Sequence, residues 1–141
     1  MAESVLRVLD FTETPGPRYI DQGPSSGEQF YLDVLNQQFA DCIKHKRSLS
    51  LELDGVAGYP SSFLDQALGE LVYDFSADLV KRYLKFKTIR FASRLPRIIN
   101  DTIPNWQKIR ENGPVPHNSL KAKGRKVYYQ DKDEKIKERE L

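Results

Sequence analysis

The stretch from Leu51 to Leu71, LELDGVAGYPSSFLDQALGEL, decides the fold because it holds a strand, a loop and a helix start in direct succession. Leucines alternate with polar residues from position 49 onward, and this period of two predicts a strand over 49–56. The glycines that follow indicate a loop. Beyond Ser61 and Ser62, apolar residues return at the spacing of one helix face, at Leu64, Leu68, Leu71, Val72 and Phe75.

Similar elements flank this unit on both sides. Apolar runs rich in β-branched and aromatic residues predict strands over 5–11 and 85–91, and a short strand over 18–20. Apolar residues at helical spacing predict helices over 27–45 and 95–110, the second one kinked or restarted at Pro104. This alternation predicts an α/β domain: a small mixed β-sheet with central parallel strands and about three or four packed helices.

The chain of 141 residues fits a single domain. We expect that domain over 1–112, followed by a charged, flexible tail over 113–141 in which a helix near 131–140 or a strand near 127–129 are alternatives. The chain begins without a basic segment followed by an apolar one, and no apolar run is long enough to cross a membrane. With a single cysteine, Cys42, these features predict a cytoplasmic protein without a membrane partner.

Charge is divided unevenly along the chain. Residues 1–80 hold 5 basic and 13 acidic residues, whereas residues 81–141 hold 17 basic and 7 acidic residues. One interpretation is a solvated surface, or attraction between the two halves. The alternative is a nucleic-acid-binding accessory protein whose basic band and tail contact phosphates. The basic band consists of Lys81, Arg82, Lys85, Lys87, Arg90, Arg94 and Arg97.

Ser61 and Ser62 have two interpretations. In the first, one of them caps the helix and completes a capping box with Asp65. In the second, an exposed hydroxyl lies in the positive field of the helix N-terminus, where free backbone N–H groups would stabilise an attached phosphate. Ser25 and Ser26 precede the helix predicted over 27–45, and the same two interpretations apply to them.

Motifs for catalysis are absent from the sequence. It contains neither a G-x-x-x-x-G-K-[ST] phosphate loop nor a G-x-S-x-G nucleophile elbow. The two histidines and the one cysteine lack the spacing of metal ligands. A lone carboxylate at a strand end, such as Asp54, usually orders the neighbouring loop. We therefore expect no enzyme, no metal and no cofactor.

The segment 51–71 resembles the core of STAS domains, the family of anti-sigma factor antagonists, in which a strand and a short loop lead to an Asp-Ser-Ser-Gly helix start. An ungapped overlay places Ser61 on the phosphorylated serine and Ser62 on its neighbour. The chain is more similar to a STAS-like family of unknown function from bacteria and phages, through GPSSGEQF (23–30) and SSFLDQALGEL (61–71). Pro60 replaces the acidic residue of the STAS motif and Phe63 replaces its glycine, which makes Ser62 a second phosphoacceptor candidate.

This resemblance, which covers roughly residues 5–110, implies a non-enzymatic regulatory module that binds a protein partner. The implied partner is an ATP-binding, histidine-kinase-like protein that phosphorylates Ser61 or Ser62 and so switches binding. The contact surface would be the 54–62 loop and the helix face after it. The partner-binding candidates are Asp54, Tyr59, Phe63 and Asp65, with the two aromatic rings as apolar anchors if they are exposed.

Overall fold

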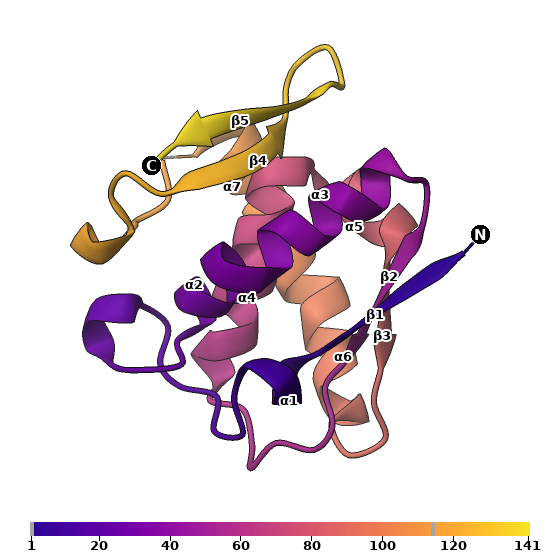
Figure 1. Ribbon diagram of the computed structural model, residues 1–141, viewed down its shortest axis with the longest axis vertical. Helices are drawn as coiled ribbons and strands as arrows, with labels where there is room; N and C mark the ends of the chain where they lie inside the picture. The colour runs from indigo at the N-terminus through magenta and orange to yellow at the C-terminus, as the bar shows by residue number, and fades with distance from the viewer. Residues whose placement is uncertain (1, 114) are drawn as a thin grey trace.

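A three-stranded parallel sheet forms the scaffold in the computed structural model, which describes residues 2–113 and 115–141 (Figure 1). Its strands are β1 (Glu3–Arg7), β2 (Ser48–Glu52) and β3 (Leu84–Lys87), in the order β1-β2-β3. Each connection between neighbouring strands passes through helices, as a parallel pairing requires. The predicted α/β fold with parallel central strands is therefore confirmed.

Helices make up most of the domain and are gathered on one side of this sheet (Figure 1). The first connection holds α2 (Gly27–Phe30), the π-helical segment η2 (Tyr31–Leu35) and α3 (Asn36–Lys44). The second holds α4 (Ser61–Phe75) and α5 (Ala77–Tyr83). After β3 come η3 (Ala92–Arg94), α6 (Leu95–Arg97), η4 (Ile98–Thr102) and α7 (Ile103–Asn112). Short turns of helix also occur at α1 (Val8–Phe11), η1 (Ile20–Gln22) and η5 (Leu120–Ala122).

Helix α4 lies at the centre of the core, and 11 of its 15 residues are buried. Two glycines allow other elements to approach it closely. A Cβ at Gly27 would overlap the backbone of Phe63, and a Cβ at Gly69 would overlap the indole ring of Trp106. Because both glycines fall in the two segments that carry the family resemblance, those segments encode the contacts of α4 with α2 and α7.

All four predicted strands differ from the structure. The strand predicted over 5–11 ends at Arg7, where the chain turns into α1, and the strand predicted over 49–56 ends at Glu52. The strand predicted over 85–91 ends at Lys87 because Asp54 accepts hydrogen bonds from the N–H groups of Ile89 and Arg90. Residues 18–20 form no strand. The carbonyl of Arg18 instead accepts from the N–H of Glu28, so this segment is tied to the start of α2.

The C-terminal segment is a folded hairpin rather than the expected flexible tail. Strand β4 (Lys126–Gln130) pairs antiparallel with β5 (Ile136–Glu140), so the helix considered near 131–140 is also wrong. Val127 is 1% exposed, and the Asn36 side chain donates to the Tyr128 carbonyl and accepts from the Tyr128 N–H. Charge-rich segments order in this way when individual side chains find buried polar partners.

Candidate functional site

A surface pocket of about 490 Å³ opens beside the N-terminus of α4. It brings together Arg18, which precedes η1, with residues of α4 and of the helices that follow β3. Its walls are formed by Arg18, Ser61, Leu64, Asp65, Ser93, Arg94, Arg97, Ile98 and Thr102. The pocket thus combines one of the two candidate phosphoacceptors with three arginines and one carboxylate.

Neither serine caps α4. The N-cap is Pro60, and no side chain makes the capping hydrogen bond there. The carboxylate of Asp65, expected to complete a capping box, instead accepts from Arg18 Nη1 at 2.8 Å and from the Thr102 hydroxyl at 3.1 Å. Ser61 is exposed and lines the pocket, whereas Ser62 is half-buried. The structure therefore removes the capping interpretation and favours Ser61 over Ser62 as the accessible hydroxyl.

The three arginines hold positive charge around this hydroxyl. Arg18 also donates from Nη1 to the side-chain oxygen of Gln66 at 3.0 Å. Arg94 Nη2 donates to the Tyr59 carbonyl at 2.8 Å, which fixes the guanidinium beside the loop that leads into α4. Arg97 is exposed at the pocket wall. Guanidinium groups bind phosphate oxygens through short, charge-assisted hydrogen bonds, so this arrangement suits a phosphorylated side chain.

The two aromatic partner-binding candidates, whose role as anchors required exposure, both belong to the core. Phe63 is fully buried and stacks on Phe30, because the first turn of α4 presses against α2. Tyr59 is 5% exposed, packs edge-on against Phe91 and donates its hydroxyl to the Leu53 carbonyl at 2.7 Å. Burial raises the pKa of the Tyr59 hydroxyl above its ordinary value, so it remains a donor.

Asp54 orders the loop after β3, as a carboxylate at a strand end often does. It accepts from the Thr88 hydroxyl at 2.6 Å and from two backbone N–H groups. These hydrogen bonds, the one from Thr88 above all, hold the pKa of the Asp54 carboxyl below its usual value. The carboxylate is thus occupied within the chain, while Asp65 is the one partner-binding candidate that lines the pocket.

The second serine pair is structural. Ser26 is fully buried and caps α2 by accepting from the N–H of Gln29 at 2.9 Å, which confirms the predicted helix start. Ser25 has a φ of 57° and accepts from the Thr12 hydroxyl at 3.0 Å. Both hydroxyls therefore have partners within the chain.

Some cations of the basic band already have partners within the chain. Lys87 lies 3.3 Å from the Glu52 carboxylate. Arg90 donates to the carbonyls of Val56 and Ala57. Arg94 and Arg97 belong to the pocket, while Lys81, Arg82 and Lys85 are exposed on α5 and β3. The band thus divides into two residues with partners within the chain, Lys87 and Arg90, two residues of the pocket, and three exposed cations.

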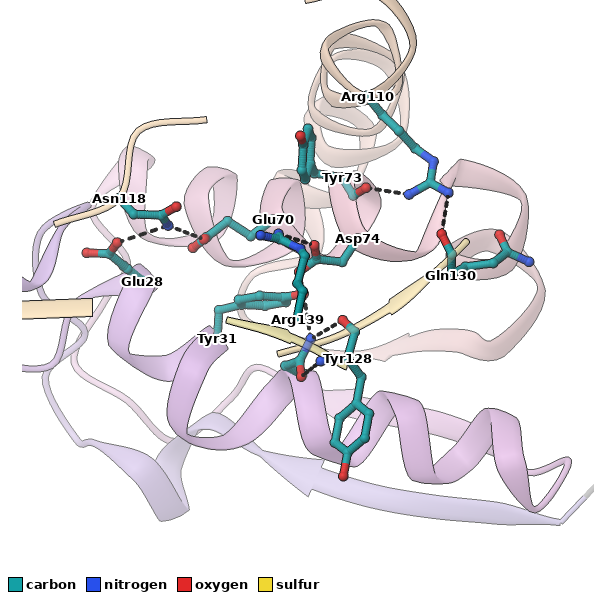
Figure 2. Close-up of polar contacts among 11 residues, drawn as sticks. Glu28, Tyr31, Glu70, Tyr73, Asp74, Arg110, Asn118, Tyr128, Gln130 and Arg139 are labelled. Carbon is teal, nitrogen blue, oxygen red and sulfur yellow. Dashed lines mark hydrogen bonds and ion pairs between the residues drawn. The ribbon is translucent and has the colours of Figure 1, made fainter. Parts of the chain in front are cut away.

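A second polar cluster lies buried between α4 and the C-terminal segment (Figure 2). Asn118 bridges two carboxylates, at 3.4 Å from Glu28 and 3.2 Å from Glu70. The Ser119 N–H and hydroxyl both donate to Glu28 as well. Further along α4, Asp74 accepts from the Tyr31 hydroxyl and, at 2.7 Å, from Arg139 of β5. These contacts hold the C-terminal segment against α4.

Burial controls the ionisation of this cluster. It raises the pKa of Glu70 well above its ordinary value, and the neighbouring charge of Asp74 adds to the effect. Burial also raises the pKa of Asp74, while the charge of Arg139 opposes that rise. One Glu70 oxygen, Oε2, is buried without a hydrogen-bond partner in the described part of the chain. Sequence reasoning missed this cluster, although a carboxylate pair four residues apart on a mostly apolar helix was a visible signal.

Two further classes of site are absent from residues 2–113 and 115–141. None of the helices there combines the length and the apolar character that crossing a bilayer demands. Nor do these residues gather three or more His, Cys, Asp or Glu side chains around a position suited to a metal ion.

No curated protein and no solved structure matches the chain significantly. Residues 26–90 match the model of one family, described as STAS-like domain of unknown function (DUF4325). The match begins at the α2 cap and ends just after β3, so it contains every element from α2 to β3, including the whole of α4, but not β1, α1 or η1. Over residues 26–90 the chain is therefore similar to a STAS-like domain of unknown function, in line with the resemblance of its sequence.

Proposed function

We propose that the protein is a non-enzymatic regulatory module whose binding to a protein partner is switched by phosphorylation of Ser61. The observation that carries this proposal is the exposed, uncapped position of Ser61 in a pocket with Arg18, Arg94 and Arg97. A helix N-cap serine would have its hydroxyl occupied by the backbone. Ser61 instead offers its hydroxyl to solvent at the first turn of a 15-residue helix.

A phosphate on this hydroxyl would be favourably placed. The first N–H groups of a helix lack intrahelical acceptors, and the helix dipole attracts negative charge. The arginines add charge-assisted donors from two other segments. Nearly two negative charges would then replace a neutral hydroxyl at the pocket, so any partner seated over the pocket would experience a different surface.

The proposed partner is an ATP-binding, histidine-kinase-like protein that both docks on this surface and transfers the phosphate. Asp65 lies in the pocket wall beside Arg18, so a docked partner would meet one carboxylate among three guanidinium groups. A partner of mixed charge fits this surface. Ser62, half-buried and outside the pocket wall, is the secondary phosphoacceptor.

The test measures partner affinity with Ser61→Ala, Ser61→Glu and Ser62→Ala, the partner being one recovered from the host by crosslinking. Ser61→Ala should bind like the unmodified protein, and Ser61→Glu should differ from it by about tenfold or more, since one charge–charge contact in a desolvated interface is worth at least that factor. Ser62→Ala is the matched control and should bind normally. Equal affinity for all three variants would refute the switch.

A further inference from the structure

We propose that two copies of this chain pair through the free edge of β1, which would join their sheets into one. This surface lies outside the pocket at α4, so the proposal goes beyond the proposed function. The strand order β1-β2-β3 places β1 at an edge of the sheet, and Figure 1 shows it running from the N-terminus in front of β2 and β3.

The register determines which backbone groups are free. The Ala2 carbonyl accepts from the Ser48 N–H, and Glu3 is in register with Ser48. In a parallel pair, alternate residues bond to the neighbouring strand, so Ser4 and Leu6 face β2 after Ala2. The N–H and C=O groups of the intervening residues, Glu3, Val5 and Arg7, consequently point away from the sheet.

The side chains of these same three residues lie on the sheet face opposite the core. Leu6 is buried beneath the sheet, whereas Val5 is 52% exposed and Glu3 and Arg7 are exposed. Val5 is one of the few large apolar side chains that the described residues leave open to solvent. An exposed β-branched residue in the middle of a free edge is typical of strands that pair with another chain.

The two edges of the sheet differ in their protection. Strand β3 exposes Lys85 and Lys87, and lysines on an edge oppose the approach of another strand. Strand β1 has the sequence ESVLR, with no lysine and no proline. Pairing is therefore favoured at β1 and opposed at β3.

The sequence of β1 is complementary to itself in antiparallel orientation. When Val5 lies opposite Val5 of the second copy, Glu3 lies opposite Arg7 and Arg7 opposite Glu3. All of these are outward-facing residues, so each opposed pair can exchange backbone hydrogen bonds. Opposite charges directly across an antiparallel pair stabilise it. A two-fold axis through Val5 would generate this contact, as in most homodimers.

The charges already present extend this pattern. Arg7, Glu52 and Lys87 lie side by side in register across the three strands, with Arg7 at 2.6 Å and Lys87 at 3.3 Å from the Glu52 carboxylate. Glu3 of a second copy would follow Arg7 in the same row. The row would then alternate in sign from Lys87 through Glu52 and Arg7 to that glutamate, which argues for a second copy of this chain as the occupant.

The charges give an experiment specific to this register. Glu3→Arg and Arg7→Glu each oppose like charges in their own homodimers, but a mixture of the two variants restores both opposite-charge pairs in a heterodimer. Sedimentation velocity over a concentration series should show the wild-type dimer, and each single variant should dimerise about tenfold or more weakly. The equimolar mixture should regain the wild-type mass.

Controls separate pairing from folding. Glu134→Arg makes the same charge change at the turn of the C-terminal hairpin and should dimerise normally. Because Arg7→Glu also removes the contact with Glu52, circular dichroism must show that the variant is folded, and amide exchange at Val5 gives a second readout. The Val5 amide should be protected in the wild type and unprotected in Glu3→Arg. A wild-type monomer at every concentration, or single variants that dimerise like wild type, would overturn the proposal.

Discussion

Replacing Glu70 by glutamine should change how the stability of this protein depends on pH. The Glu70 carboxyl is 5% exposed, lies beside Asp74 and has an oxygen without a hydrogen-bond partner among the described residues. Burial raises its pKa well above the ordinary value of 4.5. The folded state therefore binds the Glu70 proton more tightly than the unfolded state does. Its stabilisation is present below pH 4.5 and is lost as the pH rises toward the folded pKa.

The magnitude follows from the environment of Glu70. Ionisation leaves a buried charge that accepts a hydrogen bond from the Asn118 amide at 3.2 Å on one oxygen only, and an incompletely paired buried carboxylate costs on the order of 2 kcal/mol. The wild type should lose about that much unfolding free energy between weakly acidic and mildly alkaline pH. Glu70→Gln cannot ionise, so its decline over this range should be shallower.

The assay is urea unfolding at a series of pH values for the wild type and Glu70→Gln. Glu134→Gln, at the exposed hairpin turn, is the matched control and should follow the wild-type curve. At acidic pH a second effect of opposite sign appears, since hydrogen bonds lower the pKa of Asp54 and of Glu52, and their stabilisation is lost as the pH falls through those values. Parallel curves for wild type and Glu70→Gln above pH 4.5 would show that ionisation of Glu70 does not lower the stability of the folded state.

Two other variants test the packing and the hairpin. Gly69→Ala should cost about 1–3 kcal/mol of unfolding free energy because its Cβ would overlap the Trp106 indole. Gly58→Ala is the control and should cost much less, since the space around its Cβ is open. Equal melting temperatures for the two variants would contradict the close contact between Gly69 and Trp106. Asn36→Ala should lower the unfolding free energy by about 1–3 kcal/mol and speed amide hydrogen exchange at Tyr128, because the two hydrogen bonds to the Tyr128 backbone are lost. Unchanged exchange at Tyr128 would show that other contacts hold β4.

The parts of the fold that the sequence predicted are those with a repeating apolar pattern. Alternating leucines place β2, since Leu49 and Leu51 are fully buried in register between two other strands. The apolar residues of α4 recur at helical spacing because one face of the helix is buried in the core, and this pattern predicts the helix. The predicted elements end at different residues because hydrogen bonds from distant side chains, such as that from Asp54, terminate them.

The hairpin lacks such a pattern. Its strands carry charges on both faces, and Val127 is its one fully enclosed apolar side chain. Its position depends on Arg139 reaching Asp74 and on Asn36 reaching Tyr128, contacts that span 65 and 92 residues of sequence. Pairings over such distances leave no local signal.

The candidate site likewise combines features that local sequence predicts with features that depend on contacts between distant residues. Ser61 and its helix were predicted from local pattern and resemblance, but the pocket depends on Arg18, which contacts Asp65 from 47 residues away. The exposure of Tyr59 and Phe63 was open in the sequence because an aromatic residue next to a helix start can face either way. Phe63 is buried because it packs against Phe30 of α2, and Tyr59 is buried because it packs against Phe91.

Phosphosite mass spectrometry is the decisive test of whether a phosphate at the N-terminus of α4 switches partner binding. The protein would be isolated from its own host under phosphatase inhibition, with the fraction bound to a partner and the free fraction analysed separately. We expect phosphate on Ser61, with unequal occupancy in the two fractions and little on Ser62. Ser61 and Ser62 unmodified in both fractions, or equal occupancy in the two, would contradict it.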